Sequence, residues 1–261
     1  MEVLIRETPD AGCILGAKII ARVVREKPDA VLGLATGRTP LRLYQELIRL
    51  HREEDLDFSR VTTFNLDEYV GLPGTHDQSY RWFMDEHLFR HINIDRTRTH
   101  VPNGTAPDLH AECRGYEQRI ADAGGIDIQL LGLGRNGHIG FNEPTGSLRS
   151  RTWIKILSEQ TLHDNSEVFG SLEAMPRHAI TMGIGTILEA RRCLLLAFGP
   201  AKVRAVEHMI EGPLAAICPG SALQQHPRAT VILDENSAAG LRYADHYRWI
   251  DQHKLSWQRH Q

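Results

Sequence analysis

The sequence predicts an α/β fold: a single-domain, Rossmann-like three-layer sandwich with a mainly parallel central sheet. Short, continuously apolar segments recur along the 261 residues, as is typical of strands that are buried on both faces. Amphipathic segments with apolar residues at helical spacing follow several of these strands. Strands that alternate with helices favour a parallel sheet covered on both sides. Because no linker, charge block or short repeat interrupts the pattern, we expect one domain over residues 1–261.

The individual elements follow from the same pattern. Helices are predicted where apolar residues recur at helical spacing, over residues 10–27, 41–52 and 201–210. Strands are predicted over the apolar segments at residues 30–35, 61–66, 126–133, 179–182, 193–198 and 229–233. A further helix is expected within residues 243–261, packed on the domain or on another subunit.

Composition and charge narrow the class of protein. The net charge is −3, with 30 Lys and Arg against 33 Asp and Glu, so no nucleic-acid surface is expected. The N-terminus has too few consecutive apolar residues for a signal peptide, and the longest apolar run, residues 193–198, is too short to cross a bilayer. The four cysteines are far apart, and the histidines lack metal-ligand spacing. We therefore expect a cytoplasmic protein with reduced thiols, no metal site and no membrane partner.

Polar and glycine-rich segments follow four of the predicted strands. They are residues 36–39, 67–68, 135–143 and 199–202. In open α/β sheets, ligands bind beyond the carboxyl ends of the strands. The four segments are therefore expected to lie along one rim of the sheet and to form the site.

One of these segments indicates an anion. Thr36, Gly37, Arg38 and Thr39 lie between a strand and a helix. Backbone N–H groups at a helix N-terminus, together with hydroxyls, bind phosphate. Lys202 lies near the start of another helix, where lysine is not favoured, and also indicates an anion. The alternative is an ordinary strand–helix turn with threonine caps, and a solvated lysine.

Three titratable residues on this rim are candidates for proton transfer. His138 lies in a glycine-rich turn, and Glu143 follows five residues later. An imidazole can transfer protons near neutral pH, and so can a carboxylate in a confined site. Asp67 and Glu68 are adjacent in an extended segment, so their side chains point opposite ways and one can face the pocket. A structural histidine and a solvated acidic turn are the alternatives.

Longer motifs contain these residues. They are GLATGRTPLRLYQEL at 33–47, TTFNLDEYVGLP at 62–73, LGLGRNGHIGFNEP at 131–144 and GPAK at 199–202. Together they resemble the glucosamine-6-phosphate deaminase (isomerising) family, over nearly the whole chain. The resemblance implies a cofactor-free hydrolase of amino-sugar metabolism, serving N-acetylglucosamine catabolism. Its substrate would be glucosamine 6-phosphate, and its products fructose 6-phosphate and ammonia.

The resemblance also implies a role for each matching position. Asp67 corresponds to the base that moves a proton from C2 to C1 of the sugar. His138 corresponds to the acid–base group that opens the pyranose ring, and Glu143 to the residue that holds and tunes it. The positions that match the phosphate-binding region are Thr36, Gly37, Arg38, Thr39 and Lys202.

Three positions depart from the best-known members. Asn136 stands where many have an aspartate, and its carbonyl can still accept a hydrogen bond from His138. Glu167 stands where an arginine often binds the phosphate, so we expect Arg38 to supply the guanidinium unless it is simply solvated. Trp153 replaces an arginine that binds the activator N-acetylglucosamine 6-phosphate, so weak or absent activation is expected.

Other functions and assemblies stay open at this point. The same chemistry can act on another phosphorylated aminosugar, such as galactosamine 6-phosphate. A 6-phosphogluconolactonase has a related fold and a similar glycine–histidine turn, and a non-catalytic sugar-phosphate sensor shares the architecture. The TFNLDEY and GHIGFNEP segments and the retained acid–base residues favour the deaminase. A homo-oligomer is possible, because the family includes hexamers and smaller assemblies.

Overall fold

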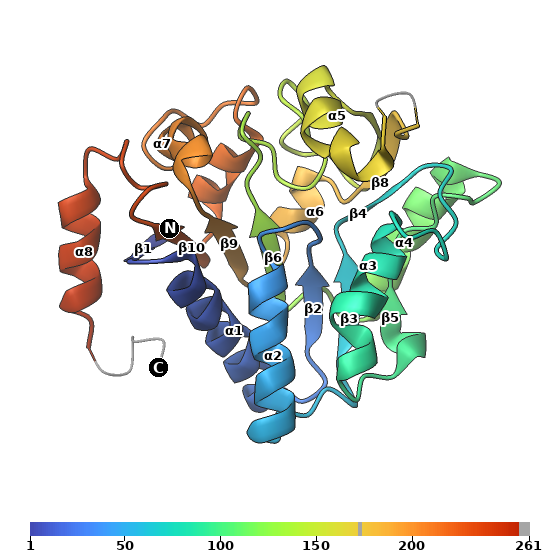
Figure 1. The fold of residues 1–261 in the computed structure, drawn as a ribbon, viewed down its shortest axis with the longest axis horizontal. Helices are drawn as coiled ribbons and strands as arrows, with labels where there is room; N and C mark the ends of the chain where they lie inside the picture. The colour runs from blue at the N-terminus through green and yellow to red at the C-terminus, as the bar shows by residue number, and fades with distance from the viewer. Residues whose placement is uncertain (172–173, 256–261) are drawn as a thin grey trace.

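A seven-stranded sheet forms the centre of the molecule (Figure 1). The computed structural model describes residues 1–171 and 174–255, without the side chains of residues 164, 165, 167 and 168. The strand order is β1-β10-β9-β6-β2-β3-β5, and each neighbouring pair is parallel. The strands are β1 (Glu2–Arg6), β2 (Val31–Leu34), β3 (Thr62–Asn65), β5 (Thr99–His100), β6 (Ile128–Gly132), β9 (Cys193–Ala197) and β10 (Ala229–Asp234). The predicted mainly parallel α/β sandwich is confirmed.

Helices cover both faces of this sheet (Figure 1). The α-helices are α1 (Pro9–Glu26), α2 (Leu41–Glu53), α3 (Tyr80–His87), α4 (Leu109–Asp122), α5 (Glu159–Asn165), α6 (Ile184–Leu188), α7 (Val203–Ile210) and α8 (Ala244–Gln252). Short 3₁₀ segments join them, namely η1 (Phe89–His91), η2 (Arg96–Arg98), η3 (Ser166–Phe169), η4 (Pro200–Lys202) and η5 (Pro219–Gln225). Among the described residues, no helix combines the length and the apolar character needed to cross a membrane.

Helix α1 illustrates how the sequence forms these layers. Thr8 caps it, because its hydroxyl accepts the backbone N–H of Ala11 at 3.2 Å, and Pro9 occupies the first turn. Its apolar side chains recur on one face and are buried against α2, β1, β9 and β10. Each buried Ile or Val on that face contributes about 1.5–3 kcal/mol to folding.

A second, three-stranded sheet lies above the carboxyl ends of the central strands (Figure 1). It is antiparallel, in the order β4 (Asp67–Tyr69), β8 (His178–Thr181) and β7 (Trp153–Ile156). The strand predicted at residues 179–182 is therefore the centre of this small sheet rather than part of the parallel one. Its register aligns Asp67 with Thr181, and Thr181 with Trp153.

Helices α3, α4, α5 and α6 and strands β4, β5 and β7 were not predicted, and the remaining differences concern β1 and the ends of elements. The helix expected over 201–210 begins as the 3₁₀ turn η4 and becomes α-helical only at Val203. The expected C-terminal helix corresponds to α8 within the described residues. Strand β1 was not predicted, because its apolar run of three residues is flanked by charged Glu2 and Arg6.

Candidate active site

One cavity of about 230 Å³ opens at the carboxyl ends of β2 and β6, where the polar rim was predicted. Seven of the nine candidate residues line it: Thr36, Gly37, Arg38, Thr39, Asp67, His138 and Lys202. The other two, Asn136 and Glu143, lie behind His138 and contact it. The structure therefore brings together residues that are more than 160 positions apart along the chain.

The cationic side chains that line the cavity come from three segments of the chain. The loop after β2 supplies Thr36 and Arg38, and η4 supplies Lys202, which is the N-cap residue of α7. Arg135 of the glycine-rich turn adds a third cation. Three cations and a hydroxyl in one small cavity form a binding site for an anion such as a phosphate group. The side chain of Glu167, expected to pair with Arg38 or to face away from it, lies outside the described part of the structure.

The two adjacent carboxylates of β4 face different environments, as their extended backbone predicts. Asp67 lines the cavity and is only 7% exposed. Burial, and then the charge of Glu68, raises the pKa of Asp67 to about 8. Glu68 instead accepts the backbone N–H groups of Tyr80 and Arg81, at 3.0 Å each, at the start of α3. Asp67 is thus the carboxylate available inside the cavity, and Glu68 binds the start of α3.

His138 and Glu143 form an electrostatic pair. Nδ1 of His138 lies 3.6 Å from Oε2 of Glu143, within ion-pair distance but too far for a hydrogen bond. Burial opposes ionisation of Glu143, but His138, Thr161 and Asn136 outweigh it and lower the pKa of Glu143 to about 2. Glu143 is therefore ionised at neutral pH and places a negative charge next to the imidazole of His138. Only glycine fits at position 134 beside this imidazole, because a Cβ at Gly134 would lie 2.3 Å from the ring.

Asn136 contacts different atoms from those expected. Its carbonyl accepts the backbone N–H of His138 at 3.2 Å rather than a proton of the imidazole. Its amide donates to Oε2 of Glu143 at 2.8 Å. Asn136 therefore fixes the turn and the carboxylate, and the imidazole itself faces Glu143.

The turn that holds His138 and Glu143 is attached to the small sheet. Asn142 is buried and donates to the carbonyl oxygens of Ile139, at 2.9 Å, and of Met182, at 2.8 Å. Its own carbonyl accepts the indole N–H of Trp153 at 3.0 Å. These three hydrogen bonds use both amide protons, so they fix the side chain and the turn around it.

Some residues that line the cavity were not predicted from the sequence. Tyr80, at the first position of α3, and Thr161, in α5, both line it. Gly140 also lines it, and a Cβ at this position would lie 2.9 Å from Oγ1 of Thr181 and 3.5 Å from Oδ2 of Asp67. Only the glycine-rich composition around Gly140 indicated a close approach. Tyr80 and Thr161 reach the cavity through packing between distant segments, for which the sequence contains no local signal.

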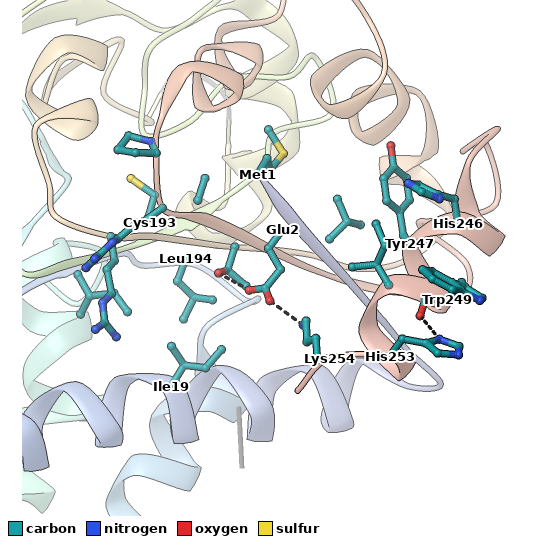
Figure 2. A pocket seen from close by; sticks show the side chains of 18 residues that line it. Met1, Glu2, Ile19, Cys193, Leu194, His246, Tyr247, Trp249, His253 and Lys254 are labelled. Atoms are coloured by element: carbon teal, nitrogen blue, oxygen red, sulfur yellow. Dashed lines mark hydrogen bonds and ion pairs between the residues drawn. The ribbon is translucent and has the colours of Figure 1, made fainter. Parts of the chain in front are cut away.

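A larger cavity of about 950 Å³ lies at the opposite, amino ends of the strands (Figure 2). It contains none of the candidate residues. Two of its ionic groups pair with each other, because Glu2 contacts the Lys254 ammonium at 2.6 Å (Figure 2). Glu2 also accepts the Thr230 hydroxyl at 2.8 Å. The smaller cavity, which is lined by the titratable side chains of Asp67 and His138, is the better candidate for chemistry.

None of the cysteines lines this cavity. The four cysteines are buried free thiols. Within the described residues, no group of three or more histidine, cysteine or acidic side chains is arranged to hold a metal ion.

Comparisons with known sequences agree on one family. A family model described as glucosamine-6-phosphate isomerases/6-phosphogluconolactonase matches residues 10–232. A glucosamine-6-phosphate deaminase of Hahella chejuensis is 52% identical over 98% of this chain and 97% of its own length. A deaminase of Rhodococcus jostii is 50% identical over 99% of both chains.

Two solved structures superpose on this chain. A structure described as a monomeric glucosamine-6-phosphate deaminase superposes with a TM-score of 0.91 at 48% identity, over 92% of this chain and 100% of the other. The 6-phosphogluconolactonase of Trypanosoma cruzi superposes with a TM-score of 0.73 at 20% identity, over 92% of this chain and 97% of the other. The second likeness concerns the fold alone.

Proposed function

The chain belongs to the glucosamine-6-phosphate isomerase/6-phosphogluconolactonase family, and we propose that it is a deaminase that converts glucosamine 6-phosphate to fructose 6-phosphate and ammonia. The observation that carries the proposal is that Asp67, His138 and Lys202 line one cavity. The cavity thus combines a base, a proton-transfer group and an anion site. Relatives that are about half identical and named as deaminases support the same substrate.

The reaction begins with opening of the sugar ring. His138 gives a proton to the ring oxygen and takes one from the anomeric hydroxyl, which leaves an open-chain aldose. Glu143 keeps a negative charge 3.6 Å from the imidazole and stabilises its protonated form. Asn136 holds Glu143 in place.

Asp67 carries out the isomerisation. Its carboxylate removes the proton from C2 and returns it to C1, while a proton passes from the amino nitrogen to the C1 oxygen. The C1 aldehyde thus becomes a hydroxymethyl group, and the C–N bond at C2 becomes an imine. One water adds to this carbon, the carbinolamine collapses, and ammonia leaves as the C2 ketone forms, which makes the net reaction hydrolytic. A carboxyl whose pKa is raised to about 8 by burial is a stronger base than an exposed aspartate.

We assign the phosphate of the substrate to the part of the cavity lined by cationic side chains. Thr36, Gly37, Thr39 and Lys202 surround it, and Arg38 supplies the guanidinium that the family often takes from the position of Glu167. Binding there orients C1 and C2 towards Asp67, because the phosphate anchors the end of the sugar that does not react.

Arg38→Ala tests the role of this guanidinium. Loss of one charge-assisted phosphate contact is expected to raise KM about tenfold or more while kcat changes little. Arg42→Ala is the matched control, because Arg42 lies in α2, pairs with Asp10 and Glu46, and does not line the cavity. An unchanged KM in Arg38→Ala would reject the assignment.

Release of ammonia is the decisive measurement for the function. The wild-type protein is incubated with glucosamine 6-phosphate, galactosamine 6-phosphate and 6-phosphogluconolactone, and ammonia, fructose 6-phosphate and acid are measured. Equal amounts of ammonia and fructose 6-phosphate from glucosamine 6-phosphate support the proposal. Faster turnover of galactosamine 6-phosphate would identify that sugar as the substrate. Hydrolysis of the lactone alone would show that the protein is a lactonase. Binding of a sugar phosphate without turnover would show that it is a sensor.

We further propose that the enzyme works without an activator. Trp153 donates its indole N–H to Asn142, and the ammonium of Lys155 lies 4.6 Å from the ring centre of Trp153. The position of the activator-binding arginine is thus occupied by a side chain that supports the catalytic turn. A cytoplasmic location and assembly into an oligomer stay predictions, which cell fractionation and sedimentation velocity can test.

A further inference from the structure

Helix α5 contacts the carboxylate of Glu143 on the side away from His138. Oε1 of Glu143 accepts the hydroxyl of Thr161 at 2.5 Å and the backbone N–H of Ser158 at 3.3 Å. Oε2 accepts the amide of Asn136 at 2.8 Å and faces the imidazole. The two oxygens therefore have separate sets of partners, and one set belongs entirely to the N-terminus of α5.

The hydrogen bonds at this helix terminus have a defined direction. Ser158 caps α5, because its hydroxyl oxygen accepts the backbone N–H of Thr161 at 3.2 Å. The hydroxyls of Ser158 and Thr161 lie 3.0 Å apart. An ionised Glu143 can only accept hydrogen bonds, so Thr161 must donate to it and can accept from Ser158. Because Thr161 is 2% exposed, water does not readily replace this donor.

We propose that Thr161 is a positioning residue: its hydroxyl fixes Glu143 so that the other carboxylate oxygen faces His138. The geometry of the proton-transfer pair then depends on the placement of α5. The catalytic consequence of this inference rests on the proposed function, but the structural link between Thr161 and Glu143 does not.

Other groups around the cavity can influence the same pair. Besides His138, the titratable or charged side chains that line the cavity are Arg38 from the loop after β2, Asp67 from β4, Tyr80 from α3, Arg135 from the glycine-rich turn and Lys202 from η4. None of these groups belongs to α5. A change confined to Thr161 therefore leaves their side chains in place and isolates the contribution of the helix.

The experiment uses the whole chain of 261 residues, with three variants compared with the wild type and a fourth used only for assignment. Thr161→Val removes the hydroxyl and keeps the shape, and Thr161→Ser keeps the hydroxyl. Thr152→Val is the matched control, because the Thr152 hydroxyl also donates to a glutamate, Glu117, at 2.5 Å, outside the cavity. Thermal unfolding measures what each change costs the fold.

Two readouts separate positioning from general destabilisation. The first is the ¹³C titration of the Glu143 carboxyl, assigned with Glu143→Gln and measured without substrate. The second is the dependence of kcat and KM on pH. In Thr161→Val we expect the Glu143 midpoint to rise by about one pH unit, because the carboxylate loses a donor. We also expect kcat to fall about tenfold with little change in KM.

The remaining variants decide the interpretation. Thr161→Ser is expected to stay close to the wild type, and Thr152→Val to be destabilised with an unchanged Glu143 midpoint and pH profile. An unchanged midpoint in Thr161→Val, or a loss in Thr161→Ser equal to that in Thr161→Val, would overturn the inference. If the wild type releases no ammonia while the Glu143 midpoint still moves in Thr161→Val, the proposed function fails and the structural link stands.

Discussion

Replacing Asp67 by asparagine is expected to stabilise the fold while removing activity. Burial and the charge of Glu68 raise the pKa of the Asp67 carboxyl from 3.8 to about 8. Between these two values the folded protein binds one proton more than the unfolded chain. The stabilisation that the protonated carboxyl provides is therefore complete at low pH and is lost as the pH rises towards 8. Asparagine has the same shape and does not titrate, so Asp67→Asn removes this loss.

The size of the effect follows from the two pKa values. Each pH unit between them corresponds to about 1.4 kcal/mol in the free energy of unfolding. At pH 7 the unfolded carboxyl is about three units above its pKa, and the folded one is still mostly protonated. The variant is therefore expected to be more stable by up to about 4 kcal/mol at pH 7. For a chain of this length, that corresponds to roughly 8 °C in the melting temperature.

The assay is urea unfolding of the wild type and the variant at several pH values from 5 to 9. The stability gap should widen with pH and level off above about pH 8, while kcat falls by roughly 10²–10⁴-fold. Glu68→Gln is the control on the same strand, and it should destabilise the protein, because Glu68 accepts backbone N–H groups at the start of α3. A gap that stays constant between pH 5 and pH 8 would refute the assignment of a raised pKa to Asp67.

Three further predictions concern the residues around the catalytic turn. Gly140→Ala should lower kcat on the order of 10²-fold, because the new Cβ would lie 2.9 Å from Oγ1 of Thr181, next to Asp67. Gly71 also has a positive φ but lies in open space, so Gly71→Ala should affect only thermal stability. Asn136→Asp should shift the acidic limb of the pH–rate profile to higher pH, because it places a second carboxylate beside Glu143. An unchanged profile would exclude an electrostatic role for this position. With Trp153 in the place of the activator-binding arginine, substrate saturation should be hyperbolic and unaffected by N-acetylglucosamine 6-phosphate; a sigmoidal curve that this sugar makes hyperbolic would contradict the prediction.

The central sheet could be predicted from the sequence because its strands are buried on both faces. Continuous apolar runs such as residues 193–198 leave few alternatives to a buried strand. The small antiparallel sheet could not be predicted in the same way. Strands β4 and β7 are short, contain polar residues, and pair with β8 across long stretches of chain. Their pairing depends on tertiary contacts, which local periodicity does not encode.

The candidate site, like the fold, could be predicted from the sequence only in part. Residues at strand ends, such as Asp67 and His138, were found because topology brings strand ends together. Their individual roles came from the family resemblance rather than from spacing. Tyr80 and Thr161 were missed, since their positions in the cavity depend on how α3 and α5 pack. The sequence also could not predict which atoms of Asn136 contact which neighbours, because either the oxygen or the nitrogen of an amide can face a given partner.

The alignment of Asp67, Thr181 and Trp153 across the small sheet limits how this segment can change in length. Neighbouring residues of a strand face opposite sides, so inserting or deleting one residue within β4 would exchange the orientations of Asp67 and Glu68. The side chain of Asp67 would then point at the start of α3, and that of Glu68 would enter the cavity. Relatives that keep this chemistry should therefore tolerate amino-acid replacements in β4 far better than single-residue insertions or deletions.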